Sequence, residues 1–176
     1  YSRAQEIFVD FIPRDRFIDT GQWVLRLFPR RIVEGRVDQW MPGGSLLNTS
    51  TRFVYPTPDT TLTIPSTAAK GISVGAYDSI NRTYADFSGR GYTRMSGQVK
   101  PDITAPGVGI TAAAAGGGRT TVSGTSFATP FVAGSAALLM EYGIVKGNDP
   151  YLYGEKIKAY LIRGAKALPF VSEYPN

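Results

Sequence analysis

The segment TVSGTSFATPFVAGSAALLM, residues 121–140, places Ser126 directly ahead of a run of small and apolar residues. A serine at the start of a helix can act as a nucleophile, because the free N–H groups and the positive end of the helix dipole stabilise the charge that develops on an acyl oxygen. Such a serine needs a base to accept its proton. The chain contains no histidine, so the commonest base is not among these residues.

Two other interpretations of this segment stay open at this point. In the first, the tetrapeptide SGTS only caps a helix, with Ser123 or Thr125 accepting hydrogen bonds from unpaired N–H groups. In the second, a lysine replaces histidine in a Ser–Lys pair, and Lys70, Lys100 and Lys146 are available for it. The tetrapeptide alone does not separate capping from catalysis.

Composition excludes several classes of function. The chain has 176 residues, of which 43% are apolar and 19% charged, as in ordinary globular domains. It has no cysteine, which excludes disulfides, cysteine-ligated zinc and a cysteine nucleophile. No loop has the ligand spacing of a calcium site, and we expect neither a metal nor another cofactor.

The charge and the hydropathy pattern bear on macromolecular partners. The net charge is +5, and the arginines grouped at positions 14–16 and 30–31 are predicted to be solvated surface. No nucleic-acid-binding motif accompanies them, so no nucleic-acid partner is expected. No apolar run approaches the ~18 residues that span a bilayer, and we expect no membrane partner.

The first third of the sequence is predicted to form β-strands. The runs EIFVDFIP, GQWVLRLFP and EGRVDQWMPGG alternate in hydropathy and are separated by turn residues. This pattern predicts three or four antiparallel strands within residues 1–56. Trp23 and Trp40 alternate within these strands, so we expect them to pack in a core rather than to bind carbohydrate, which is the alternative for such aromatic residues.

A proline- and threonine-rich segment, residues 55–70, leads into a different pattern. The run GISVGAY predicts a buried parallel strand. A helix is expected from about residue 126 to 142, with Pro130 tolerated in its first turn and Gly143 ending it. A second helix is expected over residues 153–163, closed by Gly164. The first helix has small residues that would allow close packing under a sheet, namely Ala128, Ala133, Gly134, Ala136 and Ala137.

The string SGTSFATPFVAGSAALL resembles the nucleophile segment of subtilisin-like serine proteases, the subtilases. Their pattern, Gly-Thr-Ser-x-Ala-x-Pro followed by a small-residue helix, is matched from Gly124 to Pro130. The upstream segments KPDITAPGVGI, ISVGAYDS and ADFSGRG also resemble subtilase segments, in family order, over about residues 62–165. The resemblance implies an α/β fold with a parallel sheet and a protein or peptide substrate.

The resemblance also implies roles for individual residues. Ser126 would be the nucleophile and would contribute its own N–H to the oxyanion site, and the Thr125 hydroxyl would be a second donor. Ile64, Pro65 and Ser66 would form a substrate-pocket turn with a cis-proline, the alternative being an ordinary X-Pro loop. No lysine matches a family base position. Phe127 departs from the Met or Val that many subtilases carry after the nucleophile.

A closer similarity is to the clostridial subtilases, which include spore-germination proteases, through NDPYLYGEKIKAYLIRGA and YADFSGRGYTR. Those proteins carry a β jelly-roll insert ahead of the nucleophile strand. By this resemblance residues 1–56 would be the last strands of the insert, and residues 57–176 the C-terminal part of the catalytic domain. The similarity suggests an extracytoplasmic or spore-associated location.

The family order places the catalytic Asp and His before the serine, so both would precede Tyr1. We therefore expect a C-terminal, nucleophile-bearing fragment of a serine endopeptidase that is inactive alone. Its partner would be the missing N-terminal part of the same protease. A catalytically dead pseudoprotease that serves as a binding or regulatory scaffold is the alternative. Open strand edges would also make the fragment a homo-oligomer.

Overall fold

A computed structural model describes residues 6–42, 47–48, 50–169 and 171 of the chain. The chain divides into two compact units, Tyr1–Gln39 and Trp40–Asn176. The division lies between Gln39 and Trp40, whereas the sequence analysis places a boundary after residue 56. Interpretation of the first segment as part of a jelly-roll insert stays a prediction.

The strands expected in the first 56 residues do not form. None of the described residues in this range belongs to a strand. Trp23 is 58% exposed and Trp40 56% exposed, so the expectation that they pack in a core is wrong. Trp23 instead packs edge-on against Phe11, with ring centroids 5.3 Å apart. The physical reason is that alternation specifies a strand only where a partner supplies the ladder of hydrogen bonds.

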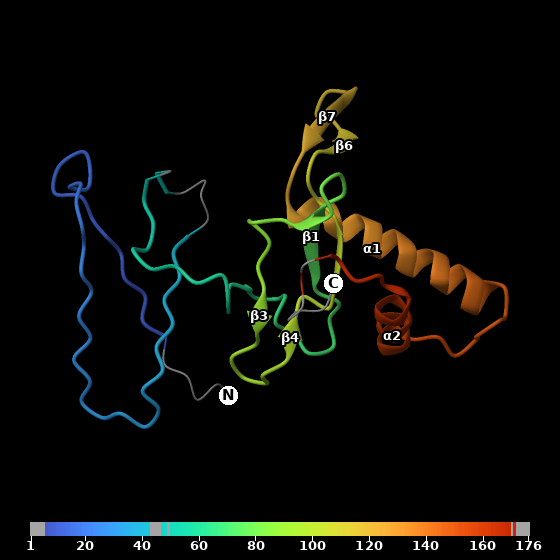
Figure 1. The fold of residues 1–176 in the computed structure, drawn as a ribbon, viewed down its shortest axis with the longest axis horizontal. Helices are drawn as coiled ribbons and strands as arrows, with labels where there is room; N and C mark the ends of the chain where they lie inside the picture. The colour runs from blue at the N-terminus through green and yellow to red at the C-terminus, as the bar shows by residue number, and fades with distance from the viewer. Residues whose placement is uncertain (1–5, 43–46, 49, 170, 172–176) are drawn as a thin grey trace. The chain divides into compact units, whose positions relative to one another are not determined.

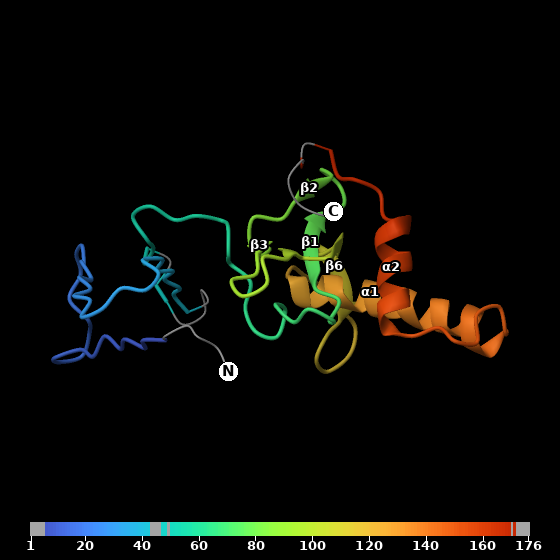
Figure 2. The same cartoon turned by 90° about the horizontal axis from the view of Figure 1, so that it is seen from below.

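The second unit is built on a three-stranded sheet in the order β2–β1–β5 (Figures 1 and 2). Strand β1 spans Val74–Asp78, β2 Thr83–Tyr84 and β5 Ile103–Pro106. β1 pairs with β5 in parallel, with Ala76 opposite Ala105, and with β2 antiparallel. The parallel strand expected from GISVGAY is confirmed, and the α/β class is confirmed with it.

Two short antiparallel pairs accompany this sheet, one between β2 and β5 in the sequence and one after β5. β3, Gly91–Tyr92, pairs with β4, Val99–Lys100. β6, Ile110–Ala113, pairs with β7, Arg119–Val122, as a hairpin that projects from the rest of the second unit (Figure 1). β7 ends only two residues before the first helix begins, so the hairpin leads directly into the segment of Ser126.

Helix α1, Thr125–Met140, packs against β1 and β5. The core between them contains Ala76, Ile103, Ala105, Ala128 and Val132. Ala128 is fully buried, as the small-residue pattern predicts. Ala133, Gly134 and Ala137 are exposed, however, because only the N-terminal half of α1 lies against the sheet in this chain.

The helix does not end at Gly143. It continues as one π-helical turn, η1, Glu141–Val145, in which Gly143 is buried and packs close to Leu152. A Cβ atom on residue 143 would lie 2.9 Å from Leu152 Cδ2 and 3.3 Å from the Asp149 carbonyl oxygen, so the glycine here favours close packing and does not end the helix. Helix α2, Gly154–Gly164, follows and packs beside α1, which agrees with the expected second helix.

The combined helix Thr125–Val145 bears on the expectation that no segment could span a membrane. It has 21 residues and a mean hydropathy of 1.3, so by length and composition alone it is long and apolar enough to cross a bilayer. The expectation was therefore wrong on these two criteria. Core helices of soluble proteins and signal sequences meet the same criteria, so one such helix is weak evidence for a membrane span.

Candidate active site

The start of α1 is fixed to the sheet by Gly107, the residue that follows β5. Its N–H donates to the Tyr77 carbonyl at 3.0 Å, and its carbonyl accepts from the Gly124 N–H at 2.8 Å. A Cβ atom on residue 107 would lie 2.5 Å from the Ala76 Cβ and 3.3 Å from the Ala128 Cβ. Only a glycine therefore lets β1 and the start of α1 approach this closely.

Gly124 is the N-cap of α1 and has a φ of 153°, which favours glycine. No side chain caps this helix end. Ser123 instead accepts a hydrogen bond from the Gly109 N–H at 3.0 Å through its Oγ. Ser123 and Thr125 therefore do not cap the helix. The first N–H groups of α1 remain available to other hydrogen-bond acceptors.

Ser126 is the second residue of α1, at the helix N-terminus as the sequence predicts, and it is exposed. Phe127 and Ala128 donate their N–H groups to the Gly124 carbonyl. The N–H groups of Thr125 and Ser126 precede the first intrahelical bond, so both can face a ligand. Within the described ranges, no hydrogen bond engages the Ser126 hydroxyl.

Pro130 lies in the second turn of α1 rather than in the first, because the helix begins at Thr125. A proline has no N–H, so the Ser126 carbonyl lacks its ordinary partner four residues along the helix. The neighbouring Thr125 carbonyl accepts a hydrogen bond from the Thr129 hydroxyl at 2.9 Å. The main chain at Ser126 is thus less constrained by the helix than that of its neighbours.

The three lysines considered as alternative bases are bound to other groups. Lys70 pairs with Glu155 at 3.4 Å and Lys146 with Glu141 at 3.4 Å. Lys100 is buried and its Nζ lies 2.6 Å from Asp102 Oδ2. Because each ammonium group already has a carboxylate partner, the geometry gives no support to a Ser–Lys pair.

The predicted turn at Ile64 and Pro65 is present, and the peptide bond between them is cis, as expected. The Ser66 N–H donates to the Thr63 carbonyl at 2.8 Å, which closes the turn. Ile64 is 89% exposed. In the described part of the chain, no hydrogen bond joins this turn to Ser126, so its role in substrate binding stays a prediction.

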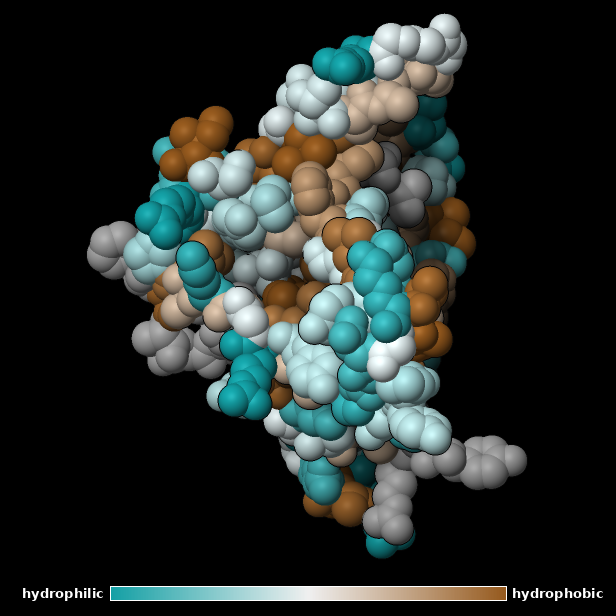
Figure 3. All heavy atoms as spheres, turned by 90° about the vertical axis from the view of Figure 1, so that its right-hand side faces the viewer, coloured by the Kyte–Doolittle hydropathy of each residue, from teal (hydrophilic) through white to brown (hydrophobic). Residues whose placement is uncertain are grey.

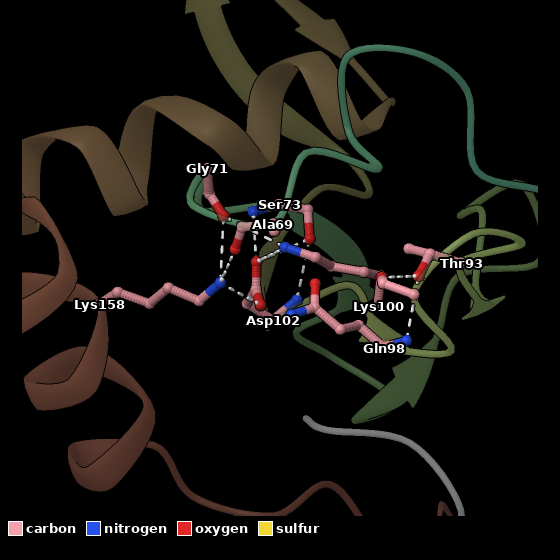
Figure 4. Close-up of polar contacts among 9 residues, drawn as sticks. Ala69, Gly71, Ser73, Thr93, Gln98, Lys100, Asp102 and Lys158 are labelled. Atoms are coloured by element: carbon pink, nitrogen blue, oxygen red, sulfur yellow. Dashed lines mark hydrogen bonds and ion pairs between the residues drawn. The ribbon is translucent and has the colours of Figure 1, made fainter. Parts of the chain in front are cut away.

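A buried ionic cluster lies at the other end of β5 (Figure 4). Asp102 Oδ2 accepts hydrogen bonds from the Ser73 N–H at 2.7 Å, the Ser73 hydroxyl at 2.9 Å and Lys100 Nζ at 2.6 Å. Asp102 Oδ1 lies 2.7 Å from Nζ of Lys158, which reaches it from α2. Both lysines also donate to the Gly71 carbonyl. One carboxylate therefore joins β1, β5 and α2.

The sequence motifs described above do not include this cluster. Lys100 is the last residue of β4, and Asp102 stands two positions later, immediately before β5. Opposite charges this close in the sequence were a usable signal for the pair, but nothing in the sequence indicated Lys158, which is distant along the chain. A buried lysine is rare unless it is paired, so burial could not be anticipated before the pairing was known.

The cluster shifts the pKa values of both partners. Burial acts to raise the pKa of Asp102, but the hydrogen bonds from Lys100, Lys158 and Ser73 outweigh it, and the pKa is lowered. Burial lowers the pKa of Lys100, and Lys158 adds to that effect, while Asp102 opposes it. The hydrogen bonds from its donors thus stabilise the ionised form of Asp102. We interpret the cluster as a structural contact rather than as a proton acceptor for Ser126.

Comparisons with known proteins agree with the motif. A model of the subtilase family matches residues 48–174. Serine protease AprX of Bacillus subtilis (strain 168) is 37% identical over 128 residues, covering 61% of this chain and 27% of that protein. The PII-type proteinase of Lactococcus lactis subsp. cremoris is 49% identical over 59 residues, covering 34% of this chain and 3% of that protein.

Among solved structures, the CspB protease of Clostridium perfringens is similar in fold and in sequence. The TM-score is 0.66 at 50% identity, over 72% of this chain and 27% of that chain. This chain thus spans about a quarter of the length of AprX and of CspB. The family match covers most of the second unit and includes Ser126 with its glycine, helix and β5 neighbours, and the chain belongs to the subtilase family.

Proposed function

We propose that this chain carries the nucleophile of a serine endopeptidase. The Ser126 Oγ attacks the carbonyl carbon of a peptide bond, the C–N bond breaks, and the resulting ester on Ser126 is hydrolysed by water. The observation that carries the proposal is the position of Ser126. It is exposed at the uncapped start of α1, and its hydroxyl has no partner in the described residues.

The oxyanion formed in this reaction is stabilised at the same helix end. The Ser126 N–H is a donor there, and the Thr125 hydroxyl is the second. The dipole of α1 favours the negative charge, and preorganised donors of this kind contribute about 2.7–4 kcal/mol each to catalysis. Ile64, Pro65 and Ser66 line the substrate pocket in this proposal, and the substrate is a protein or peptide.

The base and its orienting acid come from residues outside these 176, because the chain has no histidine. The chain alone is therefore inactive, and it acts together with the N-terminal part of the same protease. The first 56 residues belong to the jelly-roll insert in this proposal. The resemblance to the clostridial subtilases that include spore-germination proteases supports an extracytoplasmic or spore-associated location.

The test is an assay of the purified chain on casein and on peptide anilides. We expect no turnover by this chain. A longer chain that supplies the Asp and the His should cleave both substrates, and Ser126→Ala should abolish that cleavage. Ser135→Ala, which removes a hydroxyl from the same helix, is the matched control and should retain it.

Two outcomes would contradict the proposal. Turnover by the chain alone that disappears in Ser126→Ala would show that another group acts as the base. A longer chain with all three triad residues and no turnover would favour the pseudoprotease scaffold instead.

A further inference from the structure

The hairpin β6–β7 has free strand edges beside the Ser126 segment. Its register pairs Ile110 with Val122 and Ala113 with Arg119, and the Ala114 N–H donates to the Gly118 carbonyl at 3.2 Å. In an antiparallel pair, hydrogen-bonded positions alternate with positions whose N–H and C=O groups point outward. The bond at Ala114 therefore fixes the outward positions on β7 as Arg119 and Thr121.

These outward N–H and C=O groups are available to a further strand. The hairpin is a two-stranded sheet, and in the described ranges no hydrogen bond engages the outward N–H and C=O groups of Arg119 and Thr121. Apart from Arg119, the side chains along both strands are small or β-branched, and neither strand has a proline or a bulge that would block pairing. An extended peptide can therefore add to β7 as a third strand.

Arg119 gives this edge a charge preference. It is the only charged residue between Asp102 and Glu141. It is exposed at the start of β7 and has no carboxylate partner in the part of the chain that the structure describes. A hollow of about 390 Å³ adjoins it, and its lining comprises Thr111, Ala112, Ala113, Gly118 and Arg119. A carboxylate on an added strand would meet this guanidinium without competition from a neighbouring acid.

We propose that the β7 edge binds an extended substrate segment with an acidic residue opposite Arg119. This inference rests on the proposed function, because β7 runs through Ser123 and Gly124 into Ser126. Arg119 lies seven positions before Ser126 in the chain, so the acidic residue is expected to lie several residues from the bond that Ser126 cleaves. Specificity arises from one charge pair and from backbone pairing that accepts many side chains.

The probe is an acetylated and amidated octapeptide of threonine and valine with one central glutamate, titrated calorimetrically into the 176-residue chain. An exposed ion pair changes affinity only modestly, so the dissociation constant should rise about threefold when the glutamate is replaced by glutamine and about tenfold when it is replaced by lysine. Arg119→Glu should reverse the order of the glutamate and lysine peptides. Lys166→Glu, an exposed charge change outside the hairpin, is the matched control and should not.

A second variant tests the backbone pairing. Thr121→Pro removes an outward N–H while leaving the β6–β7 ladder intact, because a proline is tolerated where the N–H faces solvent. It should weaken peptide binding about fivefold, whereas Thr121→Ala should not. Circular dichroism of both variants checks that the fold is retained.

Binding needs no bond cleavage, so the outcomes separate the two proposals. A chain whose peptide binding depends on Arg119, but whose longer form cleaves nothing, contradicts the catalytic proposal alone. Equal affinity for the glutamate and lysine peptides overturns this inference alone. A dimer that Thr121→Pro converts to a monomer also overturns it, because the edge then pairs with a second copy.

Discussion

The Gly107 carbonyl accepts a hydrogen bond from the Gly124 N–H at 2.8 Å, and this contact joins the end of β5 to the N-cap of the nucleophile helix. The Gly107 N–H is bonded in turn to Tyr77 in β1. One residue thus sets the position of Ser126 relative to both parallel strands. Any displacement of residue 107 is expected to move the start of α1.

The first prediction is that Gly107→Ala destabilises the chain. The added Cβ would lie 2.5 Å from Ala76 and 3.3 Å from Ala128, so β1 and α1 must separate. Overpacking of this kind costs about 1–3 kcal/mol. Urea unfolding followed by circular dichroism measures the loss.

Gly134→Ala is the control, because no atom lies within 4 Å of the added Cβ and an alanine there should stabilise the helix by about 0.5–1 kcal/mol. Equal stability of both variants would disprove close packing at Gly107.

The second prediction concerns Asp102, the carboxylate shared by Lys100 and Lys158. Among the described residues, replacement by alanine leaves the Gly71 carbonyl as the one remaining hydrogen-bond partner of the buried Lys100 ammonium. Breaking a buried pair on one side costs about 3–5 kcal/mol, and we expect a loss of that size in urea unfolding. Asp59→Ala, at a position where the chain is exposed, should lose less. A loss below 1 kcal/mol for Asp102→Ala would mean that the cluster is not a structural hub.

The third prediction is a dependence of stability on pH. The pKa of Asp102 is lowered in the folded chain because its lysine and serine donors outweigh burial. The carboxylate therefore contributes stability above its unfolded pKa of about 4, and that contribution is lost as the pH falls through the lower, folded value. The free energy of unfolding should drop on acidification below about pH 4, and it should drop less in Asp102→Asn. Parallel curves for the two proteins would contradict this assignment.

The fourth prediction compares two lysines of α2. Lys158 is 17% exposed and reaches the buried Asp102, whereas Lys156 is 35% exposed and pairs with Asp149. Loss of a hydrogen bond to a buried charged group costs about 1.5–3 kcal/mol, while an exposed pair contributes about 0–1 kcal/mol. Lys158→Met should therefore lower the melting temperature clearly more than Lys156→Met. The reverse order would show that Lys158 does not fasten α2 to the sheet.

The sequence predicted those features whose signal is local. The glycines around Ser126, the apolar run of β1 and the breaks before and after α2 each depend on near neighbours. The sequence did not predict the features that depend on contacts between residues far apart in the chain. The alternation around Trp23 predicts a strand, but a strand forms only beside a partner. Lys158 joins Asp102 from a helix far along the chain, and no short-range pattern indicates that contact.

The last prediction is that the chain associates through α1. Only Ala128 and Val132 of this helix are buried, and Leu138 is 68% exposed and Phe131 48%. Separate hydrophobic areas occur on the side of the molecule that α1 and α2 occupy (Figure 3). Phe131 and Leu138 are seven positions apart and so lie on the same face of α1, where together they can contact a second copy. We expect light scattering at micromolar concentration to give at least twice the monomer mass of 19.0 kDa.

A charge on this helix should then separate the copies. Leu138→Glu places a carboxylate where the apolar contact forms, and burying an unpaired charge is costly, so the variant should be monomeric. Tyr151→Glu is the control, since Tyr151 is 87% exposed and lies outside α1; it should leave the mass unchanged. Thr121→Pro should also leave the measured mass unchanged, because in our proposal the β7 edge binds a peptide and not a second copy of the chain. A wild-type chain that stays monomeric would show that the exposed face of α1 does not hold a second copy.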